Sequence, residues 1–170
     1  MQNHGGYGEP YDNFYEACYK IGRSYTDANQ YLSLVHESDK AVKNLIEYFS
    51  KVDDPVEIVF FGDHQPSLNS NFYPLLNGKG MSGLTEDELE ALYTVPFFIW
   101  TNYDTPEETV DITSLNFLST MTLERAGIEL PAYNKFLADM METVPAINSR
   151  GYYSKEKQCY QHIDDATGCL

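Results

Sequence analysis

The sequence predicts an α/β fold in which helices flank an incomplete β-sheet. Two apolar runs rich in β-branched and aromatic residues, at 56–61 and 94–102, are typical of strands. Two other segments, 25–52 and 111–126, repeat apolar residues at helical spacing and are bounded by capping or turn residues. The chain has 170 residues, of which 42% are hydrophobic, so it is long enough for about one domain with an apolar core.

The clearest predicted helix spans residues 25–52. Ser24 or Thr26 can cap its start, and Pro55 follows its end. Asp39 falls on the apolar stripe of this helix, where a buried carboxylate needs a partner, and a structural role is favoured over a catalytic one. The residues of the stripe are Ala28, Tyr31, Leu32, Val35, Val42, Leu45, Ile46 and Phe49.

The predicted strand 56–61 ends at Gly62 and is followed directly by Asp63 and His64. A short apolar run bounded by turns indicates a buried strand in a parallel sheet. Catalytic groups of open α/β sheets gather beyond the carboxyl ends of strands, and a carboxylate beside an imidazole suits zinc or manganese. Neighbouring side chains on a strand point to opposite faces, so the turn at Gly62 must break that alternation. The alternative is an Asx-turn beside a solvated histidine.

The segment between the two predicted strands indicates a loop and a short helix. Residues 67–83 are rich in Asn, Ser and Gly, and a loop of this length beside a candidate site is often a functional lid. Acidic residues then open a short helix that reaches about residue 93. The second strand carries Pro96 near its start, where a missing N–H is tolerated.

The last third of the sequence predicts two helices and an undecided tail. Gly127 ends the helix of residues 111–126, and Pro131 starts a third helix that runs to about residue 144. The tail from Gly151 either forms a weak hairpin or is loose.

The net charge is strongly negative. Eleven Lys and Arg against 26 Asp and Glu give a formal charge of −15, which argues against nucleic acid or an anionic membrane as a partner bound by bulk charge. Cys18, Cys159 and Cys169 lack the spacing of a zinc site or a disulfide framework, so at most one pair can form a disulfide. The sequence contains no apolar run of ~18 residues and no signal peptide, and its polar, glycine-rich start leads us to expect a segment of a longer chain.

Five segments follow one another in a recognisable order. They are MQNHGGY at 1–7, YLSLVHESD at 31–39, FGDHQP at 61–66, VPFFIW at 95–100 and the helix at 115–127. This order resembles the carboxyl-terminal half of the sulfatase-type domain of the lipoteichoic acid synthase family, within the alkaline phosphatase superfamily. The Gly-Asp-His element is shared across the superfamily, whereas the Gln-Asn-His-Gly element with the Glu-Ser-Asp helix narrows the resemblance to this family.

The resemblance covers about residues 1–153 and leaves 154–170 as a tail. It implies a partial alkaline-phosphatase-like α/β/α sandwich, in which an incomplete sheet is flanked by helices. It also implies a parent enzyme anchored at the extracytoplasmic face of a bacterial membrane. Such enzymes move glycerol phosphate from phosphatidylglycerol to a growing polymer through a phosphorylated threonine.

The resemblance also assigns site residues. The metal of the family, usually manganese, is held by a Glu, the nucleophilic Thr and an Asp-His pair, so Asp63 and His64 are implied to be metal ligands. His4 matches the histidine that contacts the phosphoglycerol group of the substrate. Asp39 matches a helix position that is commonly acidic in the superfamily, and it has no assigned role.

The threonine nucleophile and the metal-binding Glu belong to an amino-terminal half that this sequence lacks. Two protein ligands are too few to hold a divalent ion tightly, whether manganese, magnesium or zinc. We therefore expect the 170 residues to be inactive alone and to bind metal weakly or not at all. The expected partners are the missing half, a phosphatidylglycerol-type headgroup and a polymer acceptor, with self-association through an unpaired sheet edge as an alternative.

Two other functions remain open from the sequence. The first is a sulfatase or phosphoethanolamine transferase of the same superfamily; a cysteine at the missing nucleophile position would favour the sulfatase. The second is a non-catalytic interaction module with a vestigial site.

Overall fold

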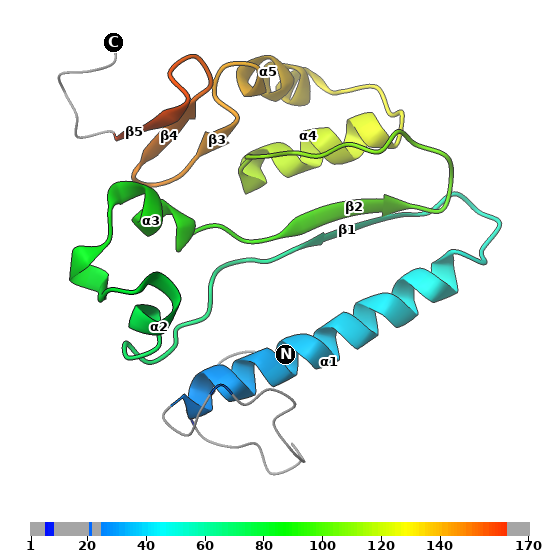
Figure 1. Ribbon diagram of the computed structural model, residues 1–170. Coiled ribbons are helices and arrows are strands. Elements are labelled where there is room, and N and C mark those ends of the chain that lie inside the picture. Colours follow the sequence, from blue (N-terminus) through cyan, green and yellow to red (C-terminus); the bar gives the residue numbers. More distant parts are fainter. Residues whose placement is uncertain (1–5, 9–20, 22–24, 163–170) are drawn as a thin grey trace. The chain divides into compact units, whose positions relative to one another are not determined.

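The computed structural model describes residues 6–8, 21 and 25–162 (Figure 1). Two compact units make up the chain: the first comprises residues 1–56 and 60–98, and the second residues 57–59 and 99–170. The described residues form both helices and small sheets, which confirms the predicted mixed α/β class.

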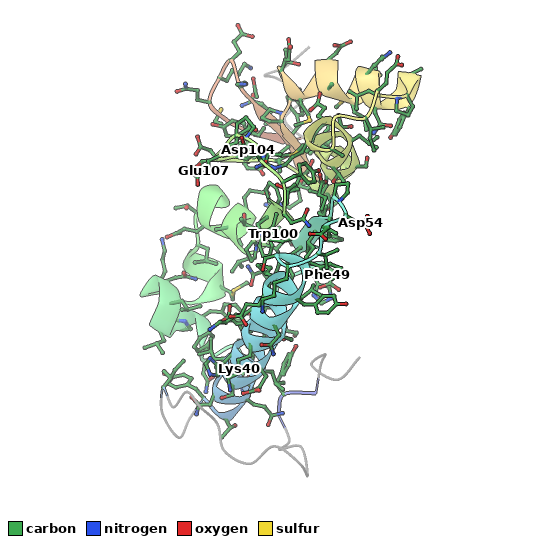
Figure 2. All side chains as sticks on the ribbon, turned by 90° about the vertical axis from the view of Figure 1, so that its right-hand side faces the viewer. Lys40, Phe49, Asp54, Trp100, Asp104 and Glu107 are labelled. Atoms are coloured by element: carbon green, nitrogen blue, oxygen red, sulfur yellow. The ribbon has the colours of Figure 1, made fainter. Side chains whose placement is uncertain are left out.

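The long helix α1 (Thr26–Phe49) matches the helix predicted at residues 25–52. Tyr25 occupies the N-cap position without a side-chain capping hydrogen bond, so the predicted cap by Thr26 is wrong, and Ser24 lies outside the described residues. Asp39 is exposed, so its carboxylate does not need the protein partner that a buried carboxylate would require. Figure 2 labels Lys40 midway along this helix and Phe49 at its end.

The apolar stripe predicted on α1 is packed unevenly. Ala28 is fully buried, whereas Val35 and Leu45 are each 43% exposed, and the buried Leu34 lies outside the predicted stripe. The helical periodicity thus predicts the helix correctly, but it does not show which part of the stripe is packed.

Strands β1 (Glu57–Phe61) and β2 (Phe97–Thr101) form a two-stranded sheet. The N–H of Gly62, just after β1, donates to the carbonyl of Pro96, just before β2, at 3.0 Å. The end of one strand therefore meets the start of the other, and the pair is antiparallel, which corrects the predicted parallel sheet. Residues 62–96 between the two strands are long enough for a parallel crossover, so the length of the connection does not decide the direction, whereas the hydrogen bond does.

Neither strand is fully buried, which corrects the second expectation for these apolar runs. The rings of Phe60 and Phe98 stack with their centroids 5.2 Å apart, yet Phe60 is 37% and Phe61 46% exposed. A strand is fully buried only when other elements cover both faces of its sheet. The described residues cover the two faces of this two-stranded sheet only in part.

The predicted loop 67–83 contains regular structure. Helix α2 (Tyr73–Asn77) ends at Gly78, whose φ of +71° favours glycine, and the 3₁₀ turn η1 (Met81–Gly83) follows. Helix α3 (Glu86–Ala91) then begins with a capping box, in which Thr85 Oγ1 accepts from the Glu88 N–H at 3.4 Å and the Glu88 carboxylate accepts from the Thr85 N–H at 2.6 Å. The Thr-x-x-Glu pattern that indicates this box is present in the sequence and was missed.

The Glu88 carboxylate makes a pH-dependent contribution to stability. The hydrogen bond from Lys79, at 2.7 Å, and the bond from the Thr85 N–H lower the pKa of Glu88 to about 2. A carboxyl group with a depressed pKa in the folded state stabilises the fold above its unfolded pKa of 4.5 and loses that contribution as pH falls towards 2. Solvent screens this exposed pair, so the effect is small.

We expect Glu88→Gln to lower the urea midpoint at pH 7, and we expect the difference from wild type to shrink as pH falls through this window. Urea titrations of both proteins across that range measure the difference. A difference that stays constant with pH would contradict the assignment.

In the second unit, helices α4 (Leu115–Arg125) and α5 (Ala132–Met141) pack together around a small core. Phe117 is fully buried and Leu137 is 4% exposed. The buried Asn134 amide of α5 donates to Thr120 Oγ1 of α4 at 3.0 Å, which satisfies a fully buried hydroxyl.

The predicted ends of these helices are mostly close to those observed. Gly127, at φ +68°, follows the end of α4 as expected, and Pro131 directly precedes α5. The start of α4 at Leu115, rather than residue 111, is a correction. Ser114 adopts an extended N-cap conformation, so the helix cannot extend back through it.

A three-stranded antiparallel sheet follows, formed by β3 (Ala146–Ile147), β4 (Gly151–Ser154) and β5 (Cys159–His162) in that order. Strands β4 and β5 pair from Gly151 opposite His162 to Ser154 opposite Cys159. As far as His162, the tail forms the hairpin, which was one of the two alternatives, and residues 163–170 lie outside the described residues. None of the described helices is long and apolar enough to cross a membrane.

Candidate metal site

Asp63 and His64 turn towards each other directly after β1. Asp63 Oδ1 accepts from the His64 N–H at 3.0 Å, and Asp63 Oδ2 lies 3.6 Å from His64 Nε2. Both side chains are open to solvent, with exposures of 71% for Asp63 and 63% for His64. The chain has left the extended conformation at this point, so the alternation of a strand no longer separates the two groups, as the proposed site requires.

The ring of His64 is oriented by the next residue. Its Nδ1 lies 2.9 Å from the carbonyl oxygen of Gln65, and a carbonyl can only accept, so Nδ1 carries the proton. With Nδ1 directed at Gln65, Nε2 is the ring nitrogen that faces Asp63.

The donor pair fits a shared divalent ion. Oxygen and nitrogen ligands lie about 2.0–2.2 Å from such an ion, so two ligands in tetrahedral geometry are about 3.3–3.6 Å apart. The 3.6 Å between Asp63 Oδ2 and His64 Nε2 agrees with this spacing. Within the described residues, no group of three or more His, Cys, Asp or Glu side chains could hold an ion.

Both residues that flank the pair are attached to the segment before β2. Gly62 donates its N–H to Pro96, and a Cβ at position 62 would lie only 2.9 Å from the Cβ of Val95. On the other side of the pair, the Gln65 amide donates to the carbonyl of Thr94. The sequence indicated the turn at Gly62 but gave no sign of the bond from Gln65, because it joins residues 29 positions apart.

The segment after the pair is tied to the start of α1. The Asp27 carboxylate accepts from the backbone N–H of Asn69. The rings of Tyr25 and Phe72 meet edge to face with centroids 5.9 Å apart, and Phe72 is 7% exposed. These contacts hold the chain on the carboxyl-terminal side of His64.

Besides Ser24, the residues His4, Cys18 and Cys169 that the sequence singled out are not described by the structure. The proposed substrate contact of His4 therefore stays a prediction. Cys159 is described, and it is an exposed free thiol.

Comparison with known families decides the assignment. The family model named Sulfatase matches residues 1–128. The chain belongs to the sulfatase family. This result confirms the superfamily that the Gly-Asp-His element indicated, and the matched region of this sulfatase-family chain includes Asp63, His64 and both strands of the first sheet.

A solved structure with a similar fold is the Streptococcus pyogenes phosphoglycerol transferase GacH, determined in complex with sn-glycerol-1-phosphate. It superposes with a TM-score of 0.64 at 21% sequence identity, over 88% of this chain and 37% of the transferase. At this identity the likeness concerns the fold, and it confirms that the chain resembles part of an alkaline-phosphatase-like domain.

Two curated relatives come from Rhizobium meliloti (strain 1021). One, named "Putative cyclic beta-1,2-glucan modification protein", is 28% identical over 150 residues. The other, capsular polysaccharide biosynthesis protein RkpI, is 41% identical over 51 residues. The sulfatase-family chain spans 23% and 10% of the lengths of these relatives.

Proposed function

We propose that this chain forms part of the catalytic domain of a metal-dependent phosphoglycerol transferase that modifies a cell-surface glycan. The observation that carries the proposal is the 3.6 Å approach of Asp63 Oδ2 and His64 Nε2 at the end of β1. The fold shared with a phosphoglycerol transferase supports the reaction class. The names of the two relatives, which concern a glucan and a capsular polysaccharide, favour a glycan acceptor over a lipoteichoic polymer.

The phosphate group of the substrate is anionic, and its charge must be neutralised during transfer. The chain carries a net charge of −15, so its overall charge does not supply this neutralisation. A bound divalent ion, which we propose to be manganese with magnesium or zinc as alternatives, supplies that charge and activates an oxygen nucleophile. Asp63 and His64 hold two of its coordination positions. His4 hydrogen-bonds the phosphoglycerol group or protonates the oxygen of the leaving diacylglycerol.

The remaining parts of the enzyme are proposed to lie outside these residues. They include a threonine nucleophile, a metal-binding Glu and a membrane anchor that places the domain at the extracytoplasmic face. Residues 1–153 form the carboxyl-terminal part of the catalytic domain, and the 170 residues alone are inactive. The exposed apolar side chains of β1 suit cover by the missing half of the domain or, failing that, by a second copy.

The test uses the complete protein that contains this sequence. Purified protein is incubated with phosphatidylglycerol vesicles and manganese, and diacylglycerol and glycerol phosphate release are measured before and after EDTA treatment. We expect release that EDTA stops and manganese restores. Hydrolysis of a sulfate ester, or diacylglycerol release from phosphatidylethanolamine alone, would replace the proposal with the corresponding alternative, and no turnover of any of the three would favour a non-catalytic module.

A separate prediction concerns His4. In the complete protein, His4→Ala is expected to retain manganese and to lower kcat by about 10²–10⁴-fold, the usual contribution of a general acid. Metal content is measured by elemental analysis and kcat by diacylglycerol release, with His36→Ala on α1 as the matched histidine control. Loss of manganese in the His4 variant would make His4 a metal ligand instead of a substrate contact.

A further inference from the structure

Gln65 makes two hydrogen bonds, one through its backbone carbonyl and one through its side-chain amide. Its carbonyl oxygen accepts from His64 Nδ1 at 2.9 Å, and its side-chain amide donates to the carbonyl of Thr94. The side chain therefore restrains the same residue whose carbonyl orients the imidazole.

The acceptor at Thr94 is itself well fixed. The N–H of Thr94 donates to the carbonyl of Ala91 at 3.2 Å, and its hydroxyl donates to the carbonyl of Glu90 at 3.4 Å. These bonds attach Thr94 to the end of α3, and Glu90 there is only 5% exposed. The Gln65 amide is thus bound to a point held by a folded element.

A second attachment lies on the other side of the pair. Gly62 is bonded to Pro96 and sits against Val95, so residues 62 and 65 are both held by residues 94–96. The two side chains between them are exposed. The attachments on both sides restrain the backbone that carries Asp63 and His64.

We propose that Gln65 is a positioning residue, whose amide bond to Thr94 holds the His64 ring with its proton on Nδ1 and its lone pair on Nε2. The inference rests on the proposed function only in so far as Nε2 binds a metal. Groups that orient a metal-binding histidine typically alter metal affinity by about 10–100-fold when they are removed. Gln65 does so without touching the metal or the substrate.

The experiment compares wild type with Gln65→Met, which keeps the length of the side chain and removes its donor, and with Ser67→Ala, an exposed control two residues away. Nitrogen chemical shifts of the His64 ring, measured by NMR on this chain without metal, report the tautomer. We expect the Nδ1–H fraction to fall in Gln65→Met and to stay at the wild-type level in Ser67→Ala. An unchanged tautomer in Gln65→Met would overturn the positioning role.

Manganese titration of the complete protein separates this inference from the proposed function. A fall in affinity of about 10–100-fold, together with the tautomer change, supports both. A tautomer change with unaltered manganese affinity supports the positioning of His64 and contradicts its role as a ligand. Gln65→Asn, which is too short to reach Thr94 but remains polar, repeats the measurement if Gln65→Met does not fold.

Discussion

Replacement of either Asp63 or His64 by alanine is expected to abolish metal-dependent release of glycerol phosphate by the complete enzyme. Each change removes one of the two proposed ligands, whose atoms lie 3.6 Å apart, so on this proposal the remaining group cannot hold the ion in the same place. We expect turnover to fall by roughly 10³-fold or more, because electrostatic stabilisation of the phosphoryl group is lost. Turnover is followed by diacylglycerol release and metal content by elemental analysis.

Stability provides the internal control for these two variants. Asp63 and His64 are 71% and 63% exposed, and exposed substitutions usually change the free energy of unfolding by less than about 0.5 kcal/mol. A loss of activity at unchanged stability therefore reports on the site. Asp53→Ala, which removes an exposed carboxylate from the turn before β1, is the matched control and should keep full activity. Normal turnover and normal metal content in either Asp63→Ala or His64→Ala would exclude the pair as ligands.

The features that the sequence predicted correctly are those with local signals. The helical spacing of apolar residues indicated α1, and Gly127 indicated the end of α4, because each signal lies within one or two helical turns. The position of Asp63 and His64 after a strand followed from Gly62 and the apolar run before it. Such signals require no knowledge of the tertiary fold.

The features that were wrong or missed depend on contacts between distant residues. Composition alone favoured a parallel sheet, and the antiparallel direction follows from the bond between Gly62 and Pro96. The bond from Gln65 to Thr94 could not be predicted from the sequence, because most glutamines lie on the surface and a glutamine alone does not indicate a bond to a distant residue. The two strands were predicted to be buried because their residue types are typical of a protein core. In the structure they are only partly covered.

Gly62→Ala is expected to destabilise the first unit and to disturb the site at the same time. An added methyl group would stand 2.9 Å from Val95 Cβ and 3.2 Å from Val95 Cγ1, which is closer than carbon atoms approach without displacement. Overpacking of this kind costs about 1–3 kcal/mol of unfolding free energy. Relief by a shift of residues 62–65 away from Val95 would move Asp63 and His64, so manganese affinity in the complete enzyme should fall as well. Urea unfolding and manganese titration measure the two effects.

Gly80→Ala is the matched control for this substitution. A Cβ at Gly80 meets nothing within 4 Å, and the φ of −73° at this residue is accessible to alanine, so we expect unchanged or slightly higher stability. The comparison separates the close approach to Val95 from the general effect of replacing a glycine. Equal stability of the two variants would mean that the chain absorbs a methyl group at position 62 without cost. The close packing of Gly62 against Val95 would then not be what holds the amino-terminal side of the metal pair, and the bond from Gly62 to Pro96 would have to do so alone.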